Sequence, residues 1–340
     1  MIKKLVILFI VIVIVVIGMV FFAKSEVNDY LGQEVYAQGD RLVTIKRGSS
    51  LRSALWQMEH KGAIERTSFS RLLPYLYPNL VNIKAGTYQV QEQATLNDLL
   101  KEMVAGNEFQ YTVTFIEGSR FSEWRTQLSL AKGLQHKTQE MTESDIAKAV
   151  GIDKDKLEGL LLAETYHYTT GMSDLDILKR SHNALMRVLN QAWETRKQGL
   201  PLKTPYEALI LASIIEKETA IESERERIAS VFVNRLNTNM RLQTDPTVIY
   251  GLGDKYDGNI RKKDLSTPTA YNTYVINGLP PTPIAMPGAK SIRAALNPET
   301  SRYLYFVASG DGGHVFTKSL PEHNRAVRNY LRKLRANKSN

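Results

Sequence analysis

The hydrophobic pattern begins with a run from Leu5 to Ala23 that contains no charged residue. A helix of this length spans about 28 Å at 1.5 Å per residue, which matches the hydrocarbon core of a bilayer. Lys3 and Lys4 precede the run, so residues 1–4 are predicted to stay in the cytoplasm and the remaining chain to lie outside it. A cleaved signal peptide is the alternative, but its apolar region would be shorter and would end in a small-residue cleavage site.

Two strand-and-helix patterns follow a polar linker that we predict over residues 24–40. In the first, an alternating strand leads to a helix capped by Ser49 or Ser50, and in the second the cap is Thr95. A glycine follows each apolar helix face and predicts its end. Together these patterns predict a small α+β subdomain over residues 41–109.

Helical patterns dominate residues 110–336, where capping boxes mark two helix starts. The segment TPYE places Thr204 three residues before Glu207, with a proline at the first helical position. The segment SERE repeats the pattern with Ser223 and Glu226. A cluster of acidic residues therefore lies between two predicted helices, where the first helix ends.

The two leading acids of this cluster differ in their helical neighbours. At steps of three and four residues, Glu218 shares a face with large aliphatic side chains, whereas Glu216 shares a face with smaller and more polar ones. Burial and the negative end of a helix both disfavour an ionised carboxylate, so the pKa of Glu218 is predicted to be raised. A neutral carboxylic acid is the proton donor that glycosidic cleavage needs. The competing interpretation is a solvated turn with ordinary surface glutamates.

Two later segments have the composition of a sugar-binding groove. Gln243, Thr244 and Asp245 precede Pro246 and are predicted to lie at the edge of a loop. Residues 266–292 form a long segment rich in proline, glycine and tyrosine, which predicts an ordered functional loop. Aromatic rings stack on pyranose faces, and amide groups bond sugar hydroxyl and N-acetyl groups.

The composition excludes several other classes. The chain of 340 residues has no cysteine, which removes disulfide frameworks, thiolate metal sites and a cysteine nucleophile. The net charge of +9 is spread along the chain, so we predict no nucleic-acid partner. His314 and His323 lack the spacing of a zinc peptidase, so we predict no metal site and interpret them as structural or groove residues.

A series of motifs identifies a known family. The segments ASIIEKET, FVNRL, MRLQTDPTVIYG, TPTAYNTY, NGLPPTPI and YLYFVASGDGGHVFTKSLPEHNRAV occur here in order. They resemble the successive motifs of the membrane-bound endolytic murein transglycosylase family, also called YceG-like. The resemblance covers nearly the whole chain and is strongest after Leu200.

This resemblance implies an α+β architecture with one inner-membrane helix, a LysM-like subdomain and a mainly helical catalytic domain with β-hairpin elements. The catalytic domain is expected to hold a lysozyme-like active-site helix. The implied reaction cleaves the β-1,4 bond after N-acetylmuramic acid inside nascent peptidoglycan strands and leaves 1,6-anhydro ends. It requires no cofactor. The implied location is the inner membrane, with the catalytic domain in the periplasm and peptidoglycan synthases as candidate partners.

The resemblance also assigns residues. The second glutamate of the family motif E-K-E-T falls on Glu218, which makes it the expected catalytic acid. Tyr271 and Asn272 are similar to the Ala-Tyr-Asn element that holds substrate in lytic transglycosylases. We infer that Gln243, Thr244 and Asp245, which match the family's Q-T-D-P, line the groove or support it.

The chain departs from the family pattern at a few positions. Where the family commonly has Pro-Asp before threonine, this chain has Ala163 and Glu164, which keeps a carboxylate and makes Glu164 a further candidate for substrate binding. Thr282 and Met286 replace a usual glycine and asparagine. These differences bear on substrate contacts and not on the reaction.

Two other functions stay open from the residues. A lysozyme-type muramidase would need a second carboxylate near Glu218, with Asp245 or Glu164 as the candidates. A membrane-tethered glycan-binding scaffold would use Glu218 only as a structural acid. The products separate these alternatives, because a lyase leaves anhydro ends, a hydrolase leaves reducing ends and a scaffold leaves strand length unchanged.

Overall fold

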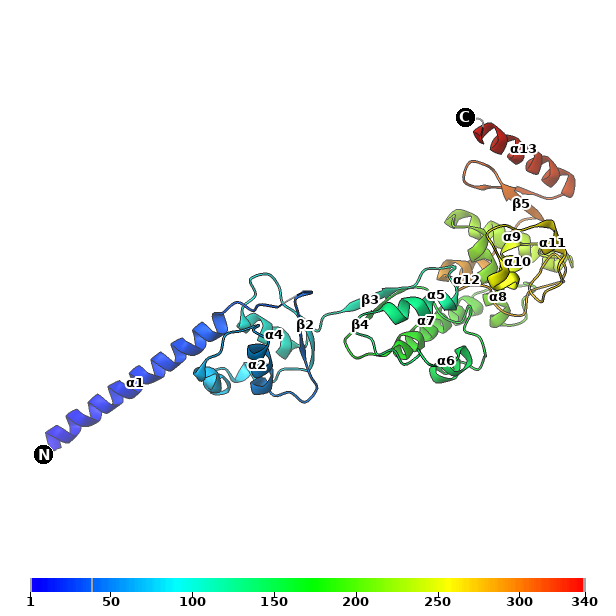
Figure 1. Ribbon diagram of the computed structural model, residues 1–340. Coiled ribbons are helices and arrows are strands. Elements are labelled where there is room, and N and C mark those ends of the chain that lie inside the picture. Colours follow the sequence, from blue (N-terminus) through cyan, green and yellow to red (C-terminus); the bar gives the residue numbers. More distant parts are fainter. Residues whose placement is uncertain (1, 38, 339–340) are drawn as a thin grey trace. The chain divides into compact units, whose positions relative to one another are not determined.

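The computed structural model describes residues 2–37 and 39–338, and the chain divides into two compact units (Figure 1). Unit 1 comprises Met1–Tyr111 with His167–Gly171, and unit 2 comprises Thr112–Tyr166 with Met172–Asn340. The mixture of helices and small antiparallel sheets confirms an α+β architecture in its coarse form.

Unit 1 begins with α1 (Ile2–Gly32), a single unbroken helix that is long and apolar enough to cross a membrane (Figure 1). The predicted linker over residues 24–40 is wrong in its first part, because α1 continues through it. Val27, Tyr30 and Leu31 on the last turns of α1 are buried in the core of unit 1. The polar residues between them face solvent, which explains why the sequence pattern predicted a linker.

The rest of unit 1 contains the two predicted strand-and-helix patterns. Its elements are β1 (Leu42–Ile45), α2 (Leu51–His60), η1 (Ser68–Leu72), α3 (Leu73–Leu76), η2 (Pro78–Leu80), β2 (Gly86–Gln89) and α4 (Leu96–Ala105). Strands β1 and β2 pair antiparallel, with Leu42 opposite Gln89. The predicted helix caps are confirmed at Ser50 and Thr95, whose side chains accept backbone N–H groups of the first turn.

Unit 2 is mainly helical. Its helices are α5 (Phe121–Leu130), α6 (Glu143–Val150), α7 (Asp174–Glu194), α8 (Pro205–Glu218), η3 (Glu222–Glu224), α9 (Arg225–Asn237), α10 (Asp245–Leu252), η4 (Gly253–Lys255), α11 (Lys262–Ser266), α12 (Ala289–Leu296) and α13 (Leu320–Lys338). Strands β3 (Tyr111–Thr114) and β4 (Thr165–Tyr168) form a two-stranded sheet, and the division between the units falls within these strands.

Helix α8 is the centre of unit 2. All residues from Ala208 to Ile215 are buried, and the helix contacts α7, α9, α10 and α12. Its predicted start is confirmed, because Thr204 Oγ1 accepts the backbone N–H of Glu207 at 3.2 Å. A helix that is apolar on all sides must be enclosed by others. The polar residues at its end are therefore held against a rigid scaffold.

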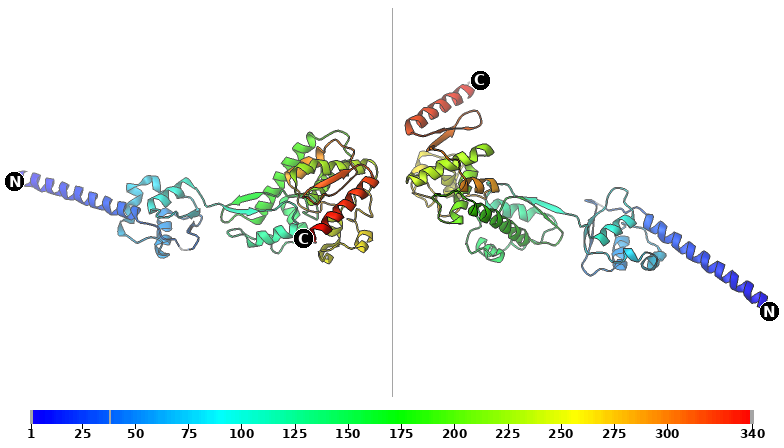
Figure 2. Two further views of the ribbon diagram at one scale, coloured as in Figure 1. Left: turned by 90° about the horizontal axis from the view of Figure 1, so that it is seen from above. Right: turned by 180° about the vertical axis from the view of Figure 1, so that it is seen from behind.

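The capping box predicted at Ser223 is wrong. The turn η3 precedes α9, whose N-cap residue Glu224 makes no side-chain cap hydrogen bond. Glu224 is instead used by the hairpin of β5 (Tyr305–Ala308) and β6 (His314–Thr317). Both views of Figure 2 show α13 beside this hairpin, and the contacts of α13 with β5 and β6 agree.

The proline-rich segment between α11 and α12 forms no helix or strand, yet much of it is buried. Asn272 and Thr273 are completely enclosed, and Ile284, Ala285 and Met286 join the core. This finding confirms the prediction of an ordered loop for residues 267–288, whereas residues 289–292 of the predicted loop belong to α12.

Candidate active site

Glu218 is the last residue of α8, and its neighbours come from three separate segments. The helix positions it at the edge of the core, next to Thr219, which ends the helix with an extended backbone. Leu211, Ile214 and Ile215, on the predicted Glu218 face, are completely buried. The carboxyl group is thus attached to a fixed backbone while the residue itself stays partly accessible.

A threonine network holds one oxygen of this carboxyl group. Thr244 Oγ1 donates a hydrogen bond to Glu218 Oε1. The Thr244 backbone N–H donates to Thr273 Oγ1 at 3.1 Å, and Thr247 Oγ1 lies 2.8 Å from the same Thr273 oxygen. Since Thr244, Thr247 and Thr273 are all buried, the hydroxyl group that meets Glu218 has little freedom to move.

The electrostatics favour a protonated Glu218. Burial raises its pKa to about 7, the hydrogen bond from Thr244 opposes this rise, and the charge of Asp245 adds to it. His314 and Arg235 are close enough to lower the value slightly. A carboxyl group with a pKa near neutrality is suited to general acid catalysis, because both of its protonation states are populated.

Asp245 and Gln243 flank Thr244 and are both exposed. Asp245 Oδ1 accepts a hydrogen bond from the Tyr274 hydroxyl group at 2.6 Å. Gln243 has a φ of 51°, in the left-handed region that non-glycine residues rarely adopt. Its backbone N–H donates to Thr273 O at 3.2 Å, which helps hold this conformation. The structure therefore brings the three predicted Q-T-D residues together beside Glu218.

Arg235 of α9 was missed as a site residue in the sequence, although it belongs to the FVNRL motif. Its guanidinium group donates to Leu304 O at 2.6 Å and to Leu242 O at 2.8 Å, and it lies over the Tyr305 ring. These bonds join the segment that leads to Thr244 with the start of β5. Arg235 is a buried cation beside the carboxyl group of Glu218.

The β5–β6 hairpin contributes His314, which the sequence predicted to be a structural or groove residue. His314 Nδ1 lies 2.6 Å from Glu224 Oε2, and the His314 backbone N–H donates to Glu224 Oε1 at 3.0 Å. Burial raises the pKa of Glu224, but both contacts with His314 lower it, and the net result is below its usual value. Glu224 thus fixes His314 near Glu218, whereas His323 stacks on Tyr305 with ring centroids 5.1 Å apart.

Tyr271 and Asn272 have different roles in the structure. Tyr271 is partly exposed, packs edge-on against Tyr250, and its hydroxyl group lies 2.9 Å from Thr282 Oγ1. Asn272 is 0% exposed, its amide nitrogen lies within hydrogen-bonding distance of three backbone carbonyl groups, and its oxygen accepts the Tyr274 N–H. The prediction that Asn272 contacts substrate is therefore corrected, because its side chain is used to shape the loop.

The loop also explains one departure from the family pattern. Met286 is completely buried and its sulfur lies 3.2 Å from the backbone nitrogen of Gly159. Gly159 has a φ of 73°, and a Cβ atom there would lie 2.2 Å from Pro283. Met286 is thus a packing residue beneath the loop.

Glu164 and Glu158 are not part of the Glu218 cluster. Glu164 is exposed just before β4, and among the described residues no recorded contact links its side chain with Glu218. Burial also raises the pKa of Glu158 to about 7. The residue is only 7% exposed, however, and its carboxyl group already accepts the Phe121 N–H at 3.2 Å. Glu158 caps α5 and is closed to a polymer substrate.

Glu216, two residues before Glu218, has a different set of partners. Its Oε1 lies 3.3 Å from Arg225 Nη2, and its Oε2 accepts the Gly288 N–H at 3.0 Å. A Cβ atom on Gly288 would lie 1.9 Å from Glu117 Oε1, so a larger residue there would displace the Glu117 carboxyl group. Glu216 therefore links α8 to α9 and to the start of α12.

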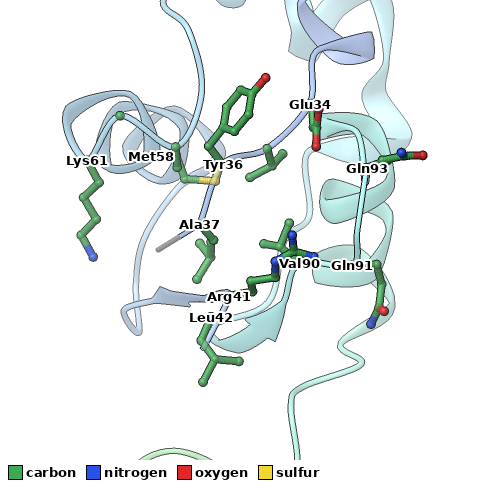
Figure 3. Close-up of a pocket in the computed structure, with 14 residues that line it drawn as sticks. Glu34, Tyr36, Ala37, Arg41, Leu42, Met58, Lys61, Val90, Gln91 and Gln93 are labelled. Carbon is green, nitrogen blue, oxygen red and sulfur yellow. The ribbon is translucent and has the colours of Figure 1, made fainter. Parts of the chain in front are cut away.

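Unit 1 contains a separate cavity of about 440 Å³ between the segment after α1, the end of α2 and the ends of β1 and β2 (Figure 3). Ala37, Leu42, Met58 and Val90 form its apolar wall, and Glu34 is the only acid among the described lining residues. All predicted site residues lie in unit 2, so the candidate active site is the Glu218 cluster.

Comparison with known proteins gives consistent results. The model of the YceG-like family matches residues 43–329. An endolytic murein transglycosylase of Bacillus subtilis is 32% identical over 315 residues, which cover 85% of this chain and 84% of that protein. A protein of the same name from Streptococcus pneumoniae is 27% identical over 359 residues, and the match covers 92% of this chain and 64% of that protein. The crystal structure of a yceG-like protein from Listeria monocytogenes is 32% identical, with a TM-score of 0.51, over 84% of this chain and 98% of that one.

Proposed function

The chain belongs to the YceG-like family, and we propose that it is an endolytic murein transglycosylase, as its curated relatives are named. The observation that carries this proposal is Glu218, an acid with a pKa of about 7 at the end of a buried helix. The proposed reaction cleaves the β-1,4 bond between N-acetylmuramic acid and N-acetylglucosamine within a glycan strand.

In the first step, neutral Glu218 donates its proton to the glycosidic oxygen as the bond to the muramic C1 atom breaks. The muramic ring takes on positive oxocarbenium character, which nearby carboxylates stabilise. Asp245 is exposed next to the Glu218-bound Thr244, and we assign its charge to this stabilisation. The hydroxyl group of Tyr274 holds the Asp245 carboxylate in place.

In the second step, ionised Glu218 takes the proton from the 6-hydroxyl group of the muramic residue. The freed oxygen bonds to C1 and closes the 1,6-anhydro ring. Glu218 recovers its proton, so one acid serves both steps and no water is consumed. Because the pKa of Glu218 is near 7, neither the donation nor the return of the proton is strongly uphill.

We assign substrate binding to Gln243 and Tyr271. Gln243 is exposed beside Thr244, and its side-chain amide can bond sugar hydroxyl or N-acetyl groups. Tyr271 offers a partly exposed ring from the loop that Asn272 organises. Glu164 lacks a described contact with this cluster, so we give it no part in the reaction.

We also propose that α1 is a retained membrane anchor with its N-terminus in the cytoplasm, which places the catalytic unit outside the membrane. A signal sequence near the N-terminus would have similar length and composition. The continuation of α1 into the core of unit 1 favours retention, because a peptidase needs an extended and accessible segment. Lys3 and Lys4 give the orientation.

Product analysis tests the proposed reaction. The purified full chain is incubated with uncrosslinked glycan strands, and the products are read by mass spectrometry. Strand ends lighter by one water, with no oxygen taken up from labelled water, are the expected result. Reducing ends that carry label would establish a hydrolase, and an unchanged strand-length distribution would leave only a binding protein.

A further inference from the structure

A segment of unit 1 wraps the end of α1, and we call this segment, residues 66–77, the collar. The Phe69 ring meets the Phe22 ring edge-on with centroids 5.8 Å apart, and the Tyr77 hydroxyl group donates to Asn28 Oδ1. Both ends of the collar are therefore fixed to α1.

These contacts determine the position of the collar along the axis of α1. The apolar run ends at Ala23, and Asn28 lies five residues, or about 7.5 Å of helix, beyond it. The headgroup layer of a bilayer is about 5 to 8 Å thick on each side of its hydrocarbon core. If α1 spans the membrane, as proposed above, the collar lies at the level of the lipid headgroups.

The collar and the adjoining α2 enclose a cavity of about 430 Å³ that is rich in arginine. Arg52, Arg66 and Arg71 line it and are exposed, and in the described parts of the chain none of them forms an ion pair or hydrogen bond. The only acid in its described lining is Glu59, which accepts a hydrogen bond from Tyr30. The lining therefore has a net positive charge and unused planar donors, which suit phosphate groups.

Two exposed aromatic residues border the same cavity. Tyr75 is 84% exposed and Trp56 is 54% exposed, and the Trp56 ring is tilted by 35° against the His60 ring with centroids 3.9 Å apart. Because both line one cavity, they form a group of exposed aromatic side chains, which is more informative than a single exposed residue. Tyrosine and tryptophan are enriched where a protein meets the membrane interface, because one end of the ring system is apolar and the other is wet.

From this placement we propose that the collar, with Arg52 and Trp56 of α2, is a docking surface for the anionic phospholipid headgroups of the bilayer that holds α1. The arginines bind lipid phosphate groups, and Tyr75 and Trp56 insert between headgroups. Unit 1 is then held against the membrane surface at more than the exit point of α1. This inference rests on the proposed anchor and is independent of the proposed reaction.

The absence of cysteine allows a clean test in the full chain. Tyr75→Cys, labelled with an environment-sensitive fluorophore, is reconstituted in nanodiscs of phosphatidylcholine alone or with phosphatidylglycerol. The control label is Gln110→Cys, an exposed position of unit 1 that immediately precedes β3. We expect the Tyr75 probe to shift to shorter wavelength and to be quenched by headgroup nitroxides in the anionic discs, while the Gln110 probe stays unchanged.

Charge variants identify the groups responsible. The triple variant Arg52→Gln, Arg66→Gln and Arg71→Gln is expected to abolish the difference between the two disc compositions. Its matched control, Arg41→Gln, Arg47→Gln and Lys101→Gln, removes three charges of unit 1 outside the lining of this cavity and is expected to keep the difference. Equal emission in both disc types would overturn the proposal, as would an equal effect of the two triple variants. A probe that responds to added glycan strands and not to anionic lipid would overturn it in favour of a glycan site. Strand cleavage, measured separately, can persist in each of these cases.

Discussion

Glu216 and Glu218 lie on the same last turn of α8, yet their carboxyl groups have different partners. Glu216 faces the guanidinium group of Arg225 and the N–H of Gly288, whereas Glu218 faces the hydroxyl group of Thr244. Both carboxyl groups have buried neighbours along the helix. The comparison teaches that two neighbouring acids of one helix can serve different purposes. Glu216 forms a buried ion pair with Arg225, whereas Glu218 meets only a hydroxyl group, and burial raises the pKa of Glu218 to about 7.

The largest expected effect is on catalysis by Glu218→Gln. Glutamine has nearly the same size but cannot donate the proton, so the rate of strand cleavage should fall by about 10² to 10⁴. Binding of glycan strands should survive, because the groove residues are unchanged. Cleavage rates from mass spectrometry and affinity for uncleaved strands give the two values. Normal turnover by this variant would show that another group is the acid.

Glu216→Gln should act mainly on stability. The side chains of Glu216 and Arg225 are only 6% and 9% exposed, and breaking a buried ion pair costs about 3 kcal/mol or more in the free energy of unfolding. For a unit of this size, the midpoint of thermal unfolding should fall by roughly 6 to 12 °C. Cleavage measured well below that midpoint should remain within a few fold of the parent rate.

The control for Glu216→Gln is Glu222→Gln. Glu222 pairs with Lys290 at 2.5 Å on the surface, and exposed pairs contribute little to stability. Its unfolding midpoint should match that of the parent. If Glu216→Gln had normal stability but no activity, Glu216 would have a role in the reaction, and its assignment as a structural residue would be wrong.

Thr244→Val should move the pH dependence of cleavage. Burial raises the pKa of Glu218 and the Thr244 hydroxyl group lowers it, so removing the hydroxyl raises the pKa further. Since the proposed reaction needs neutral Glu218, the alkaline limb of the pH–rate profile should shift upward by about one unit. The profile is measured with parent and variant at matched temperatures. An unchanged or downward shift would mean that Thr244 does not control the proton on Glu218.

The smallest expected effect is on the pH dependence of thermal stability. Because the folded-state pKa of Glu218 is about 7 and its usual value is 4.5, the group contributes its full stability below pH 4.5 and loses it as pH rises to about 7. The difference between the unfolding midpoints of Glu218→Gln and the parent should therefore grow in favour of the variant as pH rises from 4.5 to about 7. Above pH 7 this difference should stay constant. Calorimetry across this range measures the difference. A gap that narrows as pH rises would contradict the raised pKa.

The sequence could predict the position of Glu218 because helical periodicity is local. The steps to Leu211, Ile214 and Ile215 identified its buried face, and the capping residue Thr204 located the start of the helix. The contrast with Glu216 was less well founded, because the face assigned to Glu216 is buried as well. Its decisive partner, Arg225, lies on the next helix, and no pattern within α8 reveals it.

Non-local contacts also explain what sequence reasoning missed. Arg235 was missed, and His314 was predicted only as a structural or groove residue. They are held by bonds to Leu304 and Glu224, which are 69 and 90 residues away along the chain. Asn272 was predicted to contact substrate from its motif, but its amide group is satisfied by the loop itself. The polar residues after Ala23 led to the prediction of a linker. The helix α1 instead continues to Gly32, because Val27, Tyr30 and Leu31 between these polar residues are buried.

If α1 is the membrane anchor proposed above, its unbroken course has a mechanical consequence. A membrane helix whose apolar length differs from the thickness of the bilayer adjusts by tilting. Val27, Tyr30 and Leu31 join this helix to the core of unit 1 without a hinge, so the subdomain turns through the same angle as the helix. Bilayer thickness would then be a variable that sets the orientation of unit 1, and lipids of different chain length would change it without altering any residue.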